Sequence, residues 1–184
     1  MRRSPPCASR ATVRLARLGC LLLASLAAAP GPAAAEDDPG FCAAIHDVLR
    51  ASRTDFSRWR GPAREADPSS YDATRTLPRA SDCRIVRVSA HARYVCEWEY
   101  RGYEEASAQA ATTRFLDGIL ECLGDHVQQA QPSRERGADR RDTTLLVVQD
   151  EGGRVAEVRV SSWRSAKIST WYVGFSVNPR GARR

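Results

Sequence analysis

Apolar residues recur at helical spacing in two segments of the chain, 41–56 and 104–123. The stripe of the first segment consists of Phe41, Ile45, Val48, Leu49 and Ser52. The stripe of the second consists of Ala108, Ala111, Phe115, Ile119 and Cys122. Pro39 and Gly40 precede the first segment and Gly124 follows the second, and these residue types are typical of helix boundaries. The pattern therefore predicts two amphipathic helices.

Alternation of apolar and polar residues predicts strands. The segments with this pattern are 83–88, 93–100, 143–149, 154–162 and 168–177. In the second of them Tyr94, Cys96 and Trp98 fall on one face, as in a strand with one buried side. The short segments 89–92 and 150–153 separate pairs of strands and are typical of hairpin turns.

Two long segments, 57–82 and 128–142, show neither period. The first is interrupted by pairs such as Asp67-Pro68, which break regular structure. The second is rich in Gln, Arg and Asp. We expect both to be connections without strands, the second of them exposed. A connection as long as 57–82 is unusual in a compact domain and is often functional.

The predicted order of elements is α-ββ-α-βββ. A half-buried sheet needs a second layer to cover its apolar face, and two amphipathic helices can supply that layer. We therefore expect a two-layer α+β domain, with an antiparallel sheet of about five strands and two helices on one face. The other face of the sheet, which carries Arg154, Glu157 and Arg159, is expected to meet water or a partner.

The first 35 residues have the three parts of a secretory signal peptide. Five arginines and no acid accompany an apolar run at 18–29, and alanines at 33–35 form a small-residue cleavage site. The run is shorter than the ~20 residues that a membrane-spanning helix needs. We expect 1–35 to be removed, 36–178 to form a single disulfide-bonded domain, and 179–184 to be a flexible basic tail. The protein is thus expected to be exported, to the periplasm or the extracellular space.

Charge argues against nucleic acid as a partner. The chain carries 28 Lys and Arg against 22 Asp and Glu, a net charge of +6. Without the five arginines of the signal segment, 23 basic and 22 acidic residues remain, a net charge of +1. Nucleic-acid binders usually show a marked basic excess. No later apolar run is long enough to span a bilayer, so no transmembrane segment is expected in the mature chain.

Four cysteines follow the signal segment: Cys42, Cys83, Cys96 and Cys122. An even number in an exported chain favours two disulfides, and the spacing fits no compact metal motif. Cys96 and Cys122 are both expected to face the layer between sheet and helix. This favours Cys96–Cys122 together with Cys42–Cys83. The alternative joins Cys83 to Cys96 across the hairpin and Cys42 to Cys122 between the helices.

Motifs for catalysis are missing from the sequence. It contains no G-x-S-x-G, no H-E-x-x-H and no calcium loop, so we expect no catalytic residues, no metal and no cofactor. The nearest approach to a catalytic set is formed by the carboxylates Glu97, Glu99, Glu104 and Glu105. Because two carboxylates suffice for glycoside hydrolysis, a hydrolase acting on envelope polymers is the enzymatic alternative.

Trp, Tyr and Arg, the residue types that anchor interfaces, occur outside the predicted elements. The candidate binding residues are Arg58, Trp59, Arg60, Tyr71 and Trp163. The first four lie in the long connection 57–82. We therefore predict a non-enzymatic exported protein that binds another macromolecule, such as a protein, or a cell-envelope component. In a further alternative, a purely structural accessory domain, Trp59 packs against its own domain.

Overall fold

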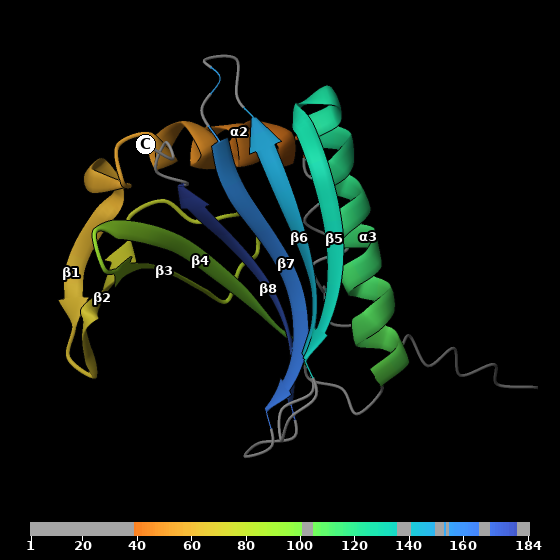
Figure 1. Ribbon diagram of the computed structural model, residues 1–184. Helices are drawn as coiled ribbons and strands as arrows, with labels where there is room; N and C mark the ends of the chain where they lie inside the picture. Colours follow the sequence, from red (N-terminus) through yellow and green to blue (C-terminus); the bar gives the residue numbers. More distant parts are fainter. Residues whose placement is uncertain are drawn as a thin grey trace, which may run out of the picture.

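Eight strands and two α-helices make up the part of the chain that the computed structural model describes, namely residues 39–100, 105–135, 141–149, 153, 155–165 and 170–179 (Figure 1). In chain order they are α2 (Phe41–Ser52), β1 (Arg60–Arg64), β2 (Asp67–Ala73), β3 (Asp82–Val88), β4 (His91–Tyr100), α3 (Glu105–Leu123), β5 (Val127–Glu135), β6 (Arg141–Gln149), β7 (Val155–Ser165) and β8 (Thr170–Pro179). Two short 3-10 helices, η1 (Ser57–Trp59) and η2 (Gly124–His126), precede β1 and β5. The expected class, α+β with an antiparallel sheet and two helices, is confirmed.

The strands form one antiparallel sheet in the order β1-β2-β3-β4-β8-β7-β6-β5. Two four-stranded meanders, β1–β4 and β5–β8, meet at the seam between β4 and β8. Helix α3 makes this arrangement possible, because it carries the chain from the end of β4 to the far edge, where β5 begins (Figure 1). The second meander then returns toward the middle. The seam pairs residues that are far apart in sequence, such as Tyr94 with Val177.

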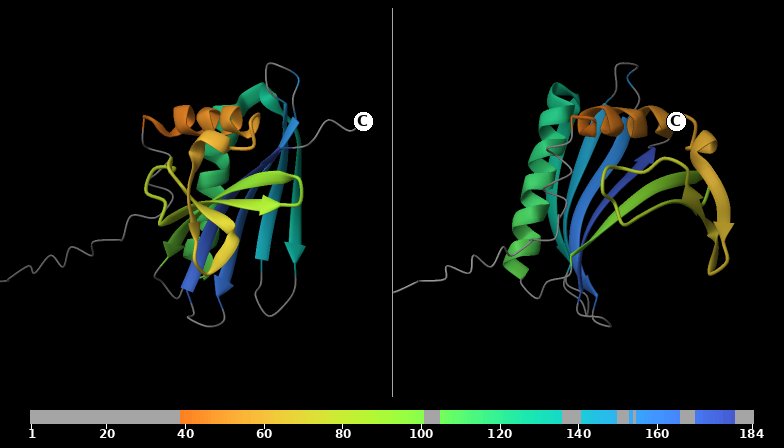
Figure 2. Two further views of the ribbon diagram at one scale, coloured as in Figure 1. Left: turned by 90° about the vertical axis from the view of Figure 1, so that its left-hand side faces the viewer. Right: turned by 180° about the vertical axis from the view of Figure 1, so that it is seen from behind.

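Both helices cover the same face of the sheet. Seen from behind, α2 lies across the strands and α3 runs along them (Figure 2, right). The fully buried Phe115 of α3 meets three aromatic rings of other elements. Its ring centroid lies 5.6 Å from Phe41 of α2, 4.6 Å from Trp98 of β4 and 6.3 Å from Phe175 of β8. This cluster is the centre of the core, and none of the described elements covers the opposite face of the sheet.

Helix α2 ends at Ser52, about one turn before the predicted end at Phe56. Asp55 and Phe56 adopt left-handed backbone conformations, with φ of 50° and 55°, which cannot continue a right-handed helix. Phe56 is nevertheless fully buried, and its ring stacks on that of Tyr94 with the centroids 5.7 Å apart. Phe56 therefore reaches the core from a turn. The hydrophobic period of the sequence does not distinguish a buried residue in the last turn of a helix from one in the turn that follows it.

The expectation that 57–82 holds no strand was wrong, since η1, β1 and β2 lie in it. Strand β1 is the outer edge of the sheet and has five residues. Its register shifts twice between Arg60 and Arg64. Pro62 fits in this strand because an edge strand needs no hydrogen-bond donor on its outer side. A short, irregular strand that contains proline shows too little alternation to be recognised from sequence.

The expectation of an exposed loop at 128–142 was also wrong. Strand β5 covers Val127–Glu135, and β6 begins at Arg141. Strand β5 is the other edge of the sheet, and its side chains at 128–132 are all exposed. A strand without a buried side has no alternation to detect. The sheet therefore has eight strands instead of about five, and the order of elements is α-ββββ-α-ββββ.

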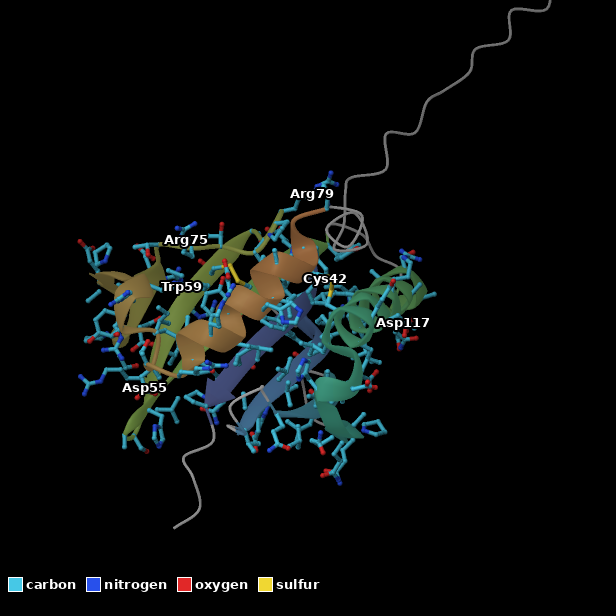
Figure 3. All side chains as sticks on the ribbon, turned by 90° about the horizontal axis from the view of Figure 1, so that it is seen from above. Cys42, Asp55, Trp59, Arg75, Arg79 and Asp117 are labelled. Atoms are coloured by element: carbon cyan, nitrogen blue, oxygen red, sulfur yellow. A yellow bond between two sulfur atoms is a disulfide. The ribbon has the colours of Figure 1, made fainter. Side chains whose placement is uncertain are left out.

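The disulfides join Cys42 to Cys122 and Cys83 to Cys96. The favoured pairing, Cys96–Cys122 with Cys42–Cys83, was therefore wrong, and the alternative is correct. Cys83 and Cys96 are directly opposite in the β3–β4 ladder, with Cα atoms 4.2 Å apart. Cys42 lies in the first turn of α2 beside the end of α3, and its Cα atom is 5.1 Å from that of Cys122 (Figure 3). Strand register decided the outcome, because the ladder partner of Cys96 is itself a cysteine.

Some expectations concern residues that the structure does not describe. The predicted signal peptide lies within 1–38, and the predicted tail lies at 180–184 except for Pro179, the last residue of β8. Among the helices of the described ranges, none is both long enough and apolar enough to cross a membrane.

Candidate functional site

Three of the predicted binding residues lie together near the β1 edge of the sheet. The side chain of Trp59 is half-buried, and its ring centroid lies 6.5 Å from Phe56 and 5.6 Å from Tyr94 (Figure 3). The guanidinium carbon of Arg60 lies 5.6 Å from the centre of the Tyr71 ring, a cation–π distance. Trp59 and Tyr71 both pack against the hydrophobic core. This cluster is therefore part of the layer between helices and sheet.

The other two predicted residues lie elsewhere. Arg58 is exposed in η1. Trp163 belongs to the open face of the sheet, opposite the helices, where its ring stacks on Tyr172 of β8 at a centroid distance of 5.5 Å. It also lies over Gly174, since a Cβ atom built on that glycine would be 2.5 Å from the indole ring. The structure thus separates Trp163 from the four residues near β1.

A trough occupies the open face around Trp163, with a volume of about 680 Å³. Small residues form its floor: Ser161 of β7 and both Gly174 and Ser176 of β8. The β3–β4 hairpin and β5 project to the same side of the sheet, away from α2 (Figure 2, left). Small side chains in the middle of a twisted sheet, bordered by larger ones, leave this hollow.

Cross-strand register determines which side chains line the trough. One row across β3, β4, β8, β7 and β6 consists of Arg84, Val95, Ser176, Arg159 and Leu145. The two neighbouring rows contribute Arg93 and Glu97, both from β4. Because side chains alternate along a strand, these residues all point away from the helices. The trough therefore combines apolar and charged side chains of strands that are distant in sequence.

A network of ion pairs crosses the open face from β1 to β4. Arg64 pairs with both Asp72 and Asp82, and Arg84 pairs with both Asp82 and Glu97. The Nε atom of Arg64 lies 2.8 Å from Oδ1 of Asp72, and Nη1 of Arg84 lies 2.6 Å from Oδ2 of Asp82. Asp82 therefore joins the two arginines and is the centre of the network.

The network favours the charged forms of Asp82 and Arg84. Burial opposes the ionisation of Asp82, but hydrogen bonds and charges from Arg64 and Arg84 hold the pKa of its carboxyl below the usual range. Burial also disfavours the charge on Arg84, yet its hydrogen bonds with Glu97 and Asp82 raise the pKa of the guanidinium. Arg84, although it lines the trough, is thus fully engaged with two carboxylates.

Arg93 and Arg159 form a second group of charges, and the carboxylate near them is that of Glu157. The Nη2 atom of Arg159 lies 3.3 Å from Oε2 of Glu157. Burial lowers the pKa of Arg93, the positive charge of Arg159 lowers it further, and Glu157 opposes both effects. The Nε atoms of the two arginines are shielded from solvent and make no hydrogen bond to a described residue. This part of the trough therefore holds two guanidinium groups near one carboxylate, and that of Arg93 is partly withdrawn from water.

Replacing Asp82 by asparagine should lower the free energy of unfolding by about 1–2 kcal/mol at pH 7, because charge-assisted hydrogen bonds to two arginines are lost at a partly exposed site. The folded pKa of Asp82 is lower than its unfolded value of about 3.9. Its stabilisation is therefore complete above that value and is lost as pH falls through the folded pKa. Urea unfolding should show a constant difference between the two proteins from pH 7 to about 5, and a shrinking difference toward pH 2.

The matched control is Asp117→Asn, which removes an exposed carboxylate on α3 (Figure 3). It should change the free energy of unfolding by less than about 0.5 kcal/mol at every pH. If the effect of Asp82→Asn stayed constant down to pH 2, the charge of Asp82 would not be the source of its stabilisation.

Sequence reasoning found part of this site. It assigned Arg154, Glu157 and Arg159 to the open face; Glu157 and Arg159 lie there, and Arg154 is outside the described residues. It did not single out Arg84 or Arg93, although the alternation of β4 already puts Arg93 on the face opposite Tyr94. The missing information was the pairing of β4 with β8, which brings Arg93 near Arg159.

The carboxylates considered for catalysis do not gather at one point. Glu97 lines the trough and pairs with Arg84, whereas Glu99 is exposed. Glu105 begins α3 in the other layer, and Glu104 lies outside the described residues. In the described part of the chain, no three His, Cys, Asp or Glu residues are grouped so that they could hold a metal ion.

A second hollow, of about 520 Å³, lies between α3 and strands β5–β7. Threonines are prominent in its lining, and Asp142 is the charged residue among those that line it. Thr112 and Thr113 of α3 donate their hydroxyl hydrogen bonds to carbonyls of their own helix. This hollow offers fewer groups to orient a ligand than the trough does.

Fold and site together define a two-layer α+β domain with a charged trough on its open sheet face. No family model matches the chain, and no curated protein matches it. Among solved structures it is similar to the 1.9 Å crystal structure of the Saccharomyces cerevisiae Ran-binding protein Mog1p and to a mutant of the protein Mog1. In both cases the identity is 12%, the TM-score is 0.31, and the match covers 64% of this chain and 65% of the other. The match thus spans less than two thirds of this chain and less than two thirds of the Mog1 chains. At this TM-score the similarity gives no information about function.

Proposed function

We propose that this chain is an exported, non-enzymatic binding domain whose trough holds part of another macromolecule, such as a protein, or of a cell-envelope component. The trough itself is the observation that carries the proposal. It is a hollow of about 680 Å³ on a sheet face that the helices leave open. Ligand sites in proteins typically measure between about 300 and 1,000 Å³ and combine apolar walls with a few polar groups.

The lining of the trough supports binding. Val95, Leu145 and Trp163 supply apolar surface, and Arg93 and Arg159 supply charge. Trp and Arg are frequent among the residues that dominate binding energies at interfaces. The accompanying carboxylates keep the surface from being uniformly basic, which argues against nucleic acid as the partner.

The packing of the Trp59 cluster moves the proposed binding surface away from the β1 edge. Trp59 and Tyr71 are packed against core residues, and their burial supports a role in holding the β1–β2 hairpin on the domain. Of the five residues predicted to bind, Trp163 is the one that lines the trough. The proposal therefore keeps the predicted function and changes the surface that performs it.

Two further observations support the proposals that the protein is not an enzyme and that it is exported. Glu97 forms an ion pair with Arg84, whereas a hydrolase that used this carboxylate would need it available for proton transfer. Two disulfides are typical of proteins that fold in an oxidising compartment, which supports export.

Site-specific photo-cross-linking in the producing organism tests this function. A benzophenone amino acid at Ser176, on the floor of the trough, should form adducts with the bound partner. The same amino acid at Asp117, exposed on α3 in the other layer, is the matched control and should form none. The adducts are identified by mass spectrometry, which detects protein as well as envelope components.

Competition separates specific binding from chance contact. An excess of the unmodified protein should suppress the Ser176 adducts by at least about tenfold, which corresponds to displacement from a saturable site. A competitor in which Ser161→Trp fills the trough should not suppress them. Adducts that form equally at both positions, or that both competitors remove equally well, would contradict binding in the trough.

A further inference from the structure

Arg93 is a half-buried cation in the wall of the trough. Its Nε atom is shielded from solvent without a hydrogen-bond acceptor, and among the described residues no carboxylate forms an ion pair with it. Burial of the guanidinium lowers its pKa, because folding withdraws this cation from water. A buried charge without a partner normally destabilises a fold. Its position in a hollow suggests that its counter-ion comes from outside the chain.

Arg159 brings a second positive charge into reach of the first. Its charge lowers the pKa of Arg93 further, so the two guanidinium groups repel each other. The side chain of Arg159 is 43% exposed although its Nε atom is shielded, and its terminal nitrogens can be approached from the trough. Arg93 and Arg159 carry two positive charges, against the single negative charge of Glu157 beside them.

We propose that Arg93 and Arg159 together bind a carboxylate, and that an acidic peptide segment lying in the trough carries it; this inference rests on the proposed binding function. Glu157 offsets one of the two positive charges of Arg93 and Arg159, and one carboxylate of a ligand would offset the other. The planar guanidinium group matches a carboxylate with two parallel hydrogen bonds. A phosphate could bring a second negative charge, which Glu157 and Glu97 would repel.

The apolar neighbours of the two arginines fit a peptide. Val86 is opposite Arg93 in the β3–β4 ladder, Val95 is two residues further along β4, and Leu145 is opposite Arg159 on β6. A small free carboxylate would leave this apolar surface in contact with water. A peptide with apolar residues beside its acid would cover the surface and gain free energy from its burial.

The buried Nε–H groups provide a direct readout by NMR, because protons that are shielded from water exchange slowly. The full disulfide-bonded chain, labelled with nitrogen isotope, is titrated with Ac-Val-Glu-Val-NH2 and in parallel with Ac-Val-Gln-Val-NH2. The signals of Arg93 and Arg159 are assigned by their loss in Arg93→Gln and Arg159→Gln. We expect saturable shifts of both signals with the glutamate peptide, and binding at least about tenfold weaker with the glutamine peptide.

Substitutions separate binding from folding. Arg93→Gln and Arg159→Gln should each weaken binding of the glutamate peptide about tenfold or more. The control Arg87→Gln removes an exposed arginine that lies on the other face of β3 and should leave binding unchanged. Arg93→Gln should not lower Tm, because it removes a half-buried charge with which no carboxylate of the described residues forms an ion pair. A clear drop in Tm would mark Arg93 as a structural residue and contradict the proposal.

Four other results would overturn the assignment. Recognition of a carboxylate by Arg93 is refuted if both peptides bind equally well, or if Arg93→Gln does not weaken binding of the glutamate peptide. The proposal that the ligand is a peptide is refuted if sodium acetate binds as tightly as the glutamate peptide does. Selectivity for a carboxylate is refuted if inorganic phosphate shifts the same signals at equal or lower concentration.

The two experiments can fail separately. If Ser176 cross-links persist and compete as expected while the two peptides bind alike, the trough binds a partner but not through a carboxylate. If the cross-links are absent as well, both the proposed function and this inference are wrong.

Discussion

Replacing Phe115 by alanine should lower the free energy of unfolding by about 3–5 kcal/mol, as expected for a large aromatic residue removed from a packed core. Phe115 is fully buried and contacts rings from α2, β4 and β8 at once. These elements are the two layers of the domain, so the cavity would lie where helix and sheet packing meet. The loss is a large part of the 5–15 kcal/mol that stabilises a typical domain. Urea unfolding followed by far-ultraviolet circular dichroism measures it.

Two further variants make this result interpretable. Phe115→Leu keeps most of the volume and should cost less than about half as much as Phe115→Ala, so it remains measurable even if the alanine variant does not fold. Thr113→Ala changes an exposed position on the same helix and should stay within about 0.5 kcal/mol of the parent. A cost below about 1.5 kcal/mol for Phe115→Ala would mean that the core is not centred on this ring.

Removing the Cys42–Cys122 disulfide with two serine substitutions should destabilise the protein by about 4 kcal/mol. The two cysteines are 80 residues apart, and a cross-link over a loop of this length restricts the unfolded chain by about 4.5 kcal/mol in the chain-entropy account. Cys42 is exposed, so a serine there should add little cost of its own. Urea unfolding of the oxidised parent and of the double variant measures the difference.

Controls for the disulfide prediction come from the same helix. Ala43→Ser introduces a serine at the neighbouring exposed position of α2 and should cost less than about 0.7 kcal/mol, the range of helix propensity. Peptide mapping of the oxidised parent should recover Cys42 with Cys122 and Cys83 with Cys96. A destabilisation below about 1 kcal/mol would contradict a cross-link that restricts the unfolded chain.

The binding surface predicted from the sequence and the trough proposed from the structure share one residue, Trp163. Trp59 and Tyr71 were predicted to bind because they lie in 57–82, a segment with neither the helical nor the strand pattern of apolar residues. The segment holds two strands, and these aromatic residues are packed on the core. Arg93 and Arg159 belong to well-predicted strands, where an outward-facing arginine gives no signal. The proposed role of these two arginines rests on the residues beside them in neighbouring strands, and the sequence of a single strand does not contain that information.

The class of the fold and most of its elements can be predicted from the amino-acid sequence alone. Two helices and the strands β3, β4, β6, β7 and β8 follow from the 3.6-residue and 2-residue periods, because each period is the local result of burying one side of an element. Strands β1, β2 and β5, the disulfide partners and the trough became visible in the three-dimensional structure. The trough and the Cys42–Cys122 pair depend on contacts between segments that are far apart in the chain, as when β4 pairs with β8 and brings Arg93 near Arg159. Strands β1 and β5, at the edges of the sheet, show too little alternation to be recognised locally. Register is set by the packing of the whole sheet, so no local pattern records it.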